Sequence, residues 1–192
     1  MGNIKDYDLL GWADDKDIKN IIDDEKIYYS DFISKISHFG LGQERIILLT
    51  DKNLYYMKNK SINLKLSYQQ ILGITLSKSS NEFILHINYD EQDFYFTSKN
   101  RNLVISQILK LYHASTNKNL KLCEVDQKRI KQYITSKKDK KKNTAFTKLD
   151  EKLIIDSKQF VEKNEKINEN EIEKDKLEKK EKLEQYTQVI KQ

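Results

Sequence analysis

The chain has 192 residues, of which 34% are charged and 38% hydrophobic, so it is long enough for one ordinary domain with an extension but not for two large cores. The formal net charge of +5 is uneven: residues 1–25 hold eight acidic and three basic side chains, whereas residues 128–142 hold eight basic side chains and one acid. The single cysteine, Cys123, excludes an internal disulfide and fits a reducing compartment. No apolar run reaches the roughly 18 residues of a transmembrane helix, so a cytoplasmic protein is expected.

Residues 1–26 are predicted to form an acidic arm. Apolar residues recur at helical spacing between Leu9 and Ile22, and Asp14 is a candidate N-cap for a short helix over residues 15–24. The arm carries Trp12, the only tryptophan of the chain. An aromatic side chain in such an arm is expected to pack back on its own domain rather than to anchor a partner.

Residues 27–125 have the pattern of a small β-rich domain. Short runs of β-branched and aromatic residues, several of them alternating with polar ones, are separated by turn signals. The period then becomes helical between Ser98 and Ser115, with Ser98 as the candidate N-cap, and residues 120–125 suit a further short strand. The seven predicted strands are 27–36, 45–50, 54–57, 62–66, 71–76, 83–87 and 94–96.

This element order predicts the α+β class. Seven strands followed by one helix are typical of a pleckstrin-homology-like β-barrel or sandwich, with the helix capping its open end. Beyond this domain, we expect a Lys-rich linker over residues 126–147 and a long charged α-helical tail over residues 148–192.

Three segments of the β-rich domain, residues 43–51, 71–77 and 83–87, carry a resemblance to a known family. In order and spacing they resemble the tail homology domain of class I myosins, over about residues 25–125. That domain has a pleckstrin-homology fold and binds phosphoinositide headgroups on membranes. No motor domain is present in these residues, so the chain is not expected to be a myosin.

The resemblance also implies a candidate lipid-headgroup site in the first hairpin. In the family, a Lys on the first strand and an Arg on the second flank a loop rich in further basic residues, and Lys35 and Arg45 match those two positions. The loop between them, residues 36–44, has no Lys or Arg and one acid, Glu44. Each cation near an anionic surface contributes on the order of 1 kcal/mol, so two alone rarely hold a protein there. Phe39 and Leu41 could insert into a bilayer instead, or contact a protein.

The sequence does not favour an enzyme. It has no nucleotide-binding glycine spacing and no nucleophile–base motif, and it implies no cofactor. His38, His86 and His113 are too scattered to predict a metal site. His86, between two apolar residues of a strand, is expected to face solvent or a neighbouring chain.

A block of lysines near residue 140 is a local electrostatic feature. It is either a solvated linker or a basic clamp for an anionic membrane or an acidic protein surface, such as the outer surface of a microtubule. Nothing aromatic interleaves it and arginine is missing, so nucleic acid is not favoured as a partner. The clamp residues are Lys137, Lys138, Lys140, Lys141 and Lys142.

The tail from residue 148 onward has a short and imperfect heptad pattern. The pattern breaks after about three repeats, so a strong self-dimer is not expected, and docking onto a larger surface is favoured. Its apolar positions are Phe146, Leu149, Leu153, Phe160 and Ile167.

Together these features predict a non-enzymatic structural or adaptor subunit of a large assembly, docking through the barrel and the tail. By analogy, the assembly is expected to be cytoskeletal or ciliary, with protein partners such as tubulin. The alternative is an adaptor that binds phosphoinositides or an anionic membrane through Lys35, Arg45 and the lysine block.

Overall fold

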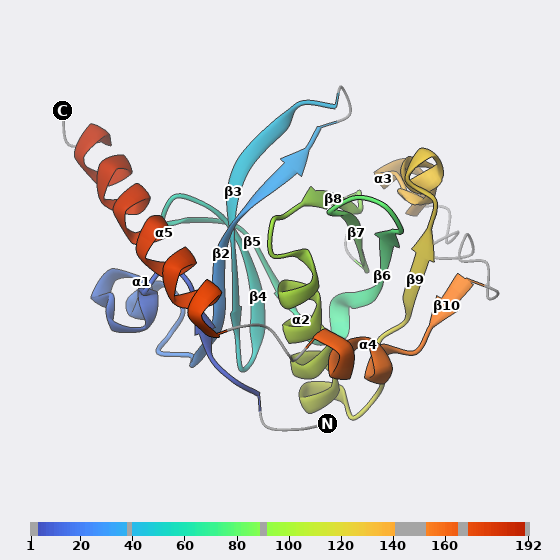
Figure 1. Cartoon of the computed structure of the whole chain (residues 1–192), viewed down its shortest axis with the longest axis horizontal. Helices are drawn as coiled ribbons and strands as arrows, with labels where there is room; N and C mark the ends of the chain where they lie inside the picture. Colours follow the sequence, from blue (N-terminus) through green and yellow to red (C-terminus); the bar gives the residue numbers. More distant parts are fainter. Residues whose placement is uncertain (1–3, 38–39, 89–91, 141–152, 165–168, 191–192) are drawn as a thin grey trace.

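The structure is a computed structural model that describes residues 4–37, 40–88, 92–140, 153–164 and 169–190. Its centre is a run of seven antiparallel strands followed by a helix (Figure 1), the pleckstrin-homology-like order predicted from the sequence. The strands are β2 (Ile27–Ile36), β3 (Gly42–Thr50), β4 (Asn53–Lys58), β5 (Ser61–Ser67), β6 (Ile71–Ser77), β7 (Glu82–Ile87) and β8 (Phe94–Thr97).

The sheet is open, which corrects the expectation of a closed barrel. In the described part of the chain, ten strands form one sheet in the order β10-β9-β6-β7-β8-β2-β3-β4-β5, with β1 (Tyr7–Asp8) pairing on β2. The two extra strands at the far end are β9 (Leu122–Val125), which runs parallel to β6, and the short β10 (Ile154–Ile155). No pairing joins β5 to β6; the 3-10 turn η2 (Tyr68–Gln70) connects them.

Helix α2 (Arg101–Thr116) packs its apolar side into the concave face of the sheet. Val104, Ile105 and Ile108 are fully buried there against residues from most of the strands. The helix begins later than predicted, because Asn100 is its N-cap, while Ser98 caps the turn before it by accepting a hydrogen bond from the Asn100 amide at 3.1 Å. This core fixes the curvature of the sheet and therefore the position of the first hairpin.

The N-terminal arm covers the outer face of β3 and β4. It contains η1 (Trp12–Asp14) and α1 (Lys16–Ile21), whose N-cap is Asp15 rather than Asp14. Trp12 is 1% exposed and lies in a second apolar cluster with Ile46, Leu48 and Tyr55. The arm thus packs on its own domain, as expected.

The C-terminal part is not the single long helix expected for residues 148–192. Its described residues form β10, α4 (Ser157–Asn164) and α5 (Glu169–Ile190), preceded by η3 (Gln127–Tyr133) and α3 (Lys137–Lys140). Strand β10 pairs with β9, and Val161 of α4 is buried in the main core beside α2. Helix α5 contacts the β2–β3 hairpin, since Lys179 pairs with Asp31 and Lys182 pairs with Glu44. Strand β10 and helix α4 therefore belong to the folded domain.

Candidate functional site

The β2–β3 hairpin carries Lys35 and Arg45 on the same face. In the antiparallel register Ile33 lies opposite Arg45, and Lys35 lies opposite Gln43. Side chains alternate along a strand, so Lys35 and Arg45 are diagonal neighbours on the face to which the core residue Ile33 also belongs. The two cations that the sequence selected thus extend the concave face of the sheet beyond its apolar core.

An aromatic floor lies beneath the two cations. The ammonium of Lys35 is 5.1 Å from the ring centre of Phe94 and 5.6 Å from that of Tyr56, which are cation–π distances. Burial raises the pKa of Tyr56 above its ordinary value, and the charge and hydrogen bonding of Arg45 offset this only in part. Tyr56 is therefore a neutral hydroxyl at physiological pH, able to donate a hydrogen bond. We call Lys35, Arg45 and Tyr56 the hairpin site.

Arg45 is oriented by its own strand. Its guanidinium donates to the carbonyl oxygen of Glu44 at 2.7 Å and to the side-chain oxygen of Gln43 at 3.0 Å. These two contacts leave further donors of the planar fork for an acceptor of another molecule.

The acid of the hairpin, Glu44, points to the opposite face. There it pairs with Lys182 of α5, and the same ammonium lies 4.6 Å from the ring centre of Phe32. Because the strand period separates neighbouring residues, the carboxylate of Glu44 and the guanidinium of Arg45 lie on different sides of the sheet. The acid that weakened the lipid hypothesis at the sequence level therefore does not face the hairpin site.

The tip of the hairpin is a tight loop with an exposed apolar residue. Ser37 and Leu41 exchange hydrogen bonds, and Gly40 adopts a left-handed φ of 78°, which a glycine tolerates best. Leu41 is 68% exposed, while Phe39 lies outside the described residues. The sequence-based choice of Leu41 as a contact residue is thus compatible with its position, and its role stays a prediction.

The lysine block begins in α3. Ser136 caps this turn, since its hydroxyl accepts from the Asp139 amide at 3.2 Å and donates to the Asp139 carboxylate at 2.7 Å. Lys137 and Lys138 are exposed, whereas the side chain of Lys140 and the whole of Lys141 and Lys142 are outside the described part.

The predicted heptad positions do not act as one helical stripe. Leu153 lies just before β10 and packs against a small cluster that contains Tyr95 and Ile130, and Phe160 of α4 packs against the main core. Phe146, Leu149 and Ile167 fall outside the described residues. Where they can be followed, these positions serve the domain itself.

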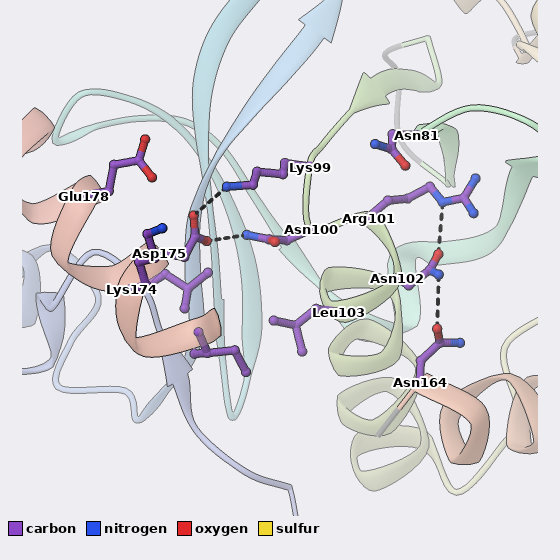
Figure 2. Close-up of a pocket in the computed structure, with 12 residues that line it drawn as sticks. Asn81, Lys99, Asn100, Arg101, Asn102, Leu103, Asn164, Lys174, Asp175 and Glu178 are labelled. Atoms are coloured by element: carbon purple, nitrogen blue, oxygen red, sulfur yellow. Dashed lines mark hydrogen bonds and ion pairs between the residues drawn. The ribbon is translucent and has the colours of Figure 1, made fainter. Parts of the chain in front are cut away.

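Polar contacts hold α5 on the domain. A cavity of about 530 Å³ lies between α5 and the start of α2. Asp175 bonds Asn100 at 2.8 Å and Lys99 at 3.4 Å, and Figure 2 shows these side chains pointing toward one another. Burial alone would raise the pKa of Asp175, but hydrogen bonds from Lys179 and Asn100 outweigh it and leave that pKa below its ordinary value. Lys179 also reaches the buried Asp31 at 2.6 Å.

Two of the three cations that line this cavity, Lys99 and Arg101, are already engaged. Arg101 donates to the carbonyl oxygens of Ser77 and Ser80 at 2.6 and 2.5 Å, and Lys99 pairs with Asp175. The contacts of Asp175 across the cavity thus attach α5 to the domain.

His86 is buried, which corrects the expectation that it faces solvent or another chain. Its ring joins Asp93 at 2.7 Å and Thr75 at 2.8 Å, and the His86 and Asp93 side chains are 3% and 1% exposed. A Thr–His–Asp set without solvent access has no route for a substrate, so it is a structural network. Among the described residues no group of His, Cys, Asp and Glu could hold a metal ion.

Tyr56 is the site residue that sequence reasoning missed. It was assigned to a strand, and nothing in its own segment distinguishes it from Tyr55. The register would have found it: Tyr56 lies opposite Ile47, which is two residues from Arg45 and hence on the same face.

The fold and the hairpin site together define the class of this protein. It is a pleckstrin-homology-like domain with an open sheet and a pair of cations on the first hairpin. The family follows from the sequence match. The chain belongs to the unconventional myosin tail family, described as actin- and lipid-binding, whose model matches residues 7–178. The match extends beyond the resemblance at residues 25–125 and takes in most of the arm, η3, β10, α4 and part of α5.

Solved structures show partial similarity. The C-terminal domain of an unknown protein from Leishmania infantum is 15% identical over 50% of this chain and 91% of its own, with a TM-score of 0.41. The N-terminal pleckstrin-homology domain of human ARAP2 is 17% identical over 45% and 80%, with a TM-score of 0.38. The corresponding domain of human oxysterol-binding protein-related protein 11 is 15% identical over 46% and 82%, with a TM-score of 0.39. Similarities of this size carry no argument about function.

No curated protein matches the chain. In the described residues, none of the helices combines the length and the apolar character needed to cross a bilayer.

Proposed function

We propose that this protein is a non-enzymatic adaptor that binds phosphorylated headgroups of anionic lipids through the hairpin site. The observation that carries the proposal is the placement of Lys35 and Arg45 on one face of the hairpin, above Tyr56, with Glu44 turned to the other face. Membership of a family described as actin- and lipid-binding supports it. These two observations support the lipid-binding alternative better than the microtubule hypothesis.

Each residue of the hairpin site has a distinct part in this proposal. The planar fork of Arg45 suits two oxygens of one phosphate group, and Lys35 adds a point charge held over the two rings. Tyr56, neutral at physiological pH, donates its hydroxyl proton to a phosphate or an inositol oxygen. An anion there replaces water around cations that already lie against an apolar floor, which strengthens each contact.

The expected cytoskeletal role requires a filament as the binding partner. The description of the family names actin, and it gives no support to tubulin or to a cilium. We therefore expect a filament partner, if one binds, to be actin. Cosedimentation with actin filaments and with microtubules distinguishes the two.

The test uses the full chain and the double variant Lys35→Gln/Arg45→Gln. Isothermal titration with a soluble inositol polyphosphate should give binding for the wild type and a loss of about 100-fold for the variant, since each charged contact contributes roughly 1.5 kcal/mol or more. The control is Lys118→Gln/Lys121→Gln, which removes the same charge from exposed positions around the start of β9. Circular dichroism establishes that all three proteins are folded. Equal affinity of the site variant and the wild type would refute the proposal.

A further inference from the structure

We propose that α3 and the hairpin site form one membrane-facing surface, so that the domain docks on an anionic bilayer with four cations and an apolar tip at one end of the molecule. We call this surface the basic rim; it consists of Lys35, Arg45, Lys137 and Lys138, with Leu41 at the hairpin tip. The inference rests on the proposed function, because the hairpin site is half of the rim. Its new content is the second half, which comes from a segment about 100 residues further along the chain.

A two-bond clip brings this distant segment to the hairpin. The Asp93 amide donates to the carbonyl oxygen of Thr135 at 3.1 Å, and the Thr135 amide donates back to the Asp93 carboxylate at 3.0 Å. The same carboxylate is bonded by His86, so the clip is anchored in a buried network. Asp93 immediately precedes Phe94, whose ring lies under the ammonium of Lys35, and Thr135 is two residues from Lys137.

Apolar packing gives a second, independent link. Ile36, the neighbour of Lys35, packs against the cluster that contains Tyr133, and Ile134 packs against the same cluster. Because side chains alternate along β2, Ile36 points to the face opposite Lys35, so the chain enters α3 from the outer face of the sheet, near the end of the hairpin where Ile36 pairs with Gly42. Figure 1 shows α3 on the side of the molecule toward which β2 and β3 project.

The rim replaces charge that the hairpin loop lacks. Residues 36–44 contain no Lys or Arg, and two cations alone hold a protein weakly on an anionic surface. Each added lysine near such a surface strengthens partition roughly fivefold, so Lys137 and Lys138 together add roughly 25-fold. Charges at the opposite end of β9 add little, because screening removes their effect beyond a Debye length of about 8 Å.

The chemistry of the rim selects a lipid surface rather than an acidic protein. Leu41 is 68% exposed on the hairpin that carries Lys35 and Arg45, and Glu44 of the same hairpin pairs with Lys182 on the other face. An apolar tip among cations fits the boundary between headgroups and acyl chains, where the side chain enters the apolar layer while the cations remain at the phosphates.

The first test compares Lys137→Gln/Lys138→Gln with the matched control Lys118→Gln/Lys121→Gln in the full chain. Partition onto phosphatidylcholine vesicles containing phosphatidylserine and a phosphoinositide is measured by cosedimentation at physiological salt. We expect the α3 variant to bind about 25-fold more weakly and the control to change by less than about twofold. Equal partition of the two variants would overturn the inference.

The two proposals fail in distinguishable ways. Titration with a soluble inositol polyphosphate reports on the hairpin site alone, so the α3 variant should bind it within about threefold of the wild type. If the wild type binds both the soluble ligand and vesicles, but the α3 variant binds vesicles normally, only the rim is refuted. If the wild type binds neither, the proposed function and the rim fall together.

A second test reports the orientation directly. Cys123 is fully buried, so single cysteines at Leu41→Cys, Lys138→Cys and Lys118→Cys can be labelled with a fluorophore in the native background. On vesicles that carry lipid-attached quenchers, we expect quenching of the labels at 41 and 138 but not of the label at 118. Quenching at 41 without quenching at 138 would show that α3 does not face the bilayer.

Discussion

At the scale of single residues, the hairpin separates opposite charges by strand alternation. Glu44 and Arg45 are adjacent in sequence, yet one pairs with Lys182 of α5 and the other lies beside Tyr56. The two strands that flank the loop therefore turn Lys35 and Arg45, but not Glu44, to the face that carries Ile33. The relevant quantity for ligand binding is the charge per face, not the charge per segment.

Leu41 provides the first prediction at this scale. Leu41→Ser should weaken partition onto anionic vesicles about tenfold, because burying a leucine side chain in an apolar layer contributes roughly 1.5 kcal/mol or more. The thermal midpoint should stay unchanged, since the side chain is 68% exposed in the folded protein. Cosedimentation and a thermal melt measure the two effects.

A matched control separates insertion from general surface hydrophobicity. Leu177 on α5 is 63% exposed, so Leu177→Ser removes the same side chain from a surface of similar exposure. It should leave vesicle partition unchanged. If both variants weaken partition alike, Leu41 has no special place in membrane contact.

At the scale of elements, α5 is held by ion pairs more than by apolar packing. Lys179 lies between the carboxylates of Asp31 and Asp175, at 2.6 and 2.5 Å, and its side chain is 12% exposed. Asp31 is also bonded by Tyr29 and by Asn100, at 2.9 and 3.0 Å. Removing the ammonium would leave two poorly solvated carboxylates facing each other.

Lys179→Met should therefore release α5 from the domain. Loss of one partner of a buried ion pair costs about 3 kcal/mol or more, so amide hydrogen exchange in α5 should accelerate about 100-fold. Lys180→Met, a change at the exposed neighbouring position, should leave exchange unchanged. Exchange that is equal in the two variants would mean that other contacts hold the helix.

At the scale of the whole molecule, elements beyond residue 126 complete the domain. Ile130 and Tyr133 of η3 cover β7 and β8, β10 extends β9, and Val161 fills the core beside α2. The boundaries predicted at residues 26, 125 and 147 describe changes in composition and stay predictions. The apolar clusters of the domain include residues on both sides of residue 125.

A fragment of residues 1–126 should accordingly be much less stable than the full chain. Among the described residues it loses the buried side chains of Ile130, Tyr133 and Val161, each worth roughly 1.5–3 kcal/mol, and it exposes the edge of β9. Chemical denaturation of the two proteins, followed by circular dichroism, measures the difference. A fragment as stable as the full chain would show that the later elements add nothing to the fold.

The sequence predicted what is decided locally. Alternation such as Ile62, Leu64, Leu66 fixes a strand whatever its partner, and the helical stripe that ends near Tyr112 fixes α2. The structure of the C-terminal part depends on tertiary contacts that the sequence does not show. Leu153 and Phe160 fit a heptad, yet the segment after Leu153 pairs with β9 and the helix that contains Phe160 packs beside α2. For the same reason, Lys35 and Arg45 could be selected from the sequence, but not the attachment of the segment before α3 to the start of β8, which depends on the Asp93–Thr135 pairing.

The open sheet also bears on how copies of this protein meet each other. In the described residues, an unclosed sheet ends in two strands with free backbone groups, β5 on one side and β10 on the other. Edges of this kind recruit strands from other molecules unless they are short or charged. Strand β10 has two residues, and β5 carries Lys65, which pairs with Glu25 at 3.4 Å. Both edges are thus poor templates for strand addition by a second copy of the chain.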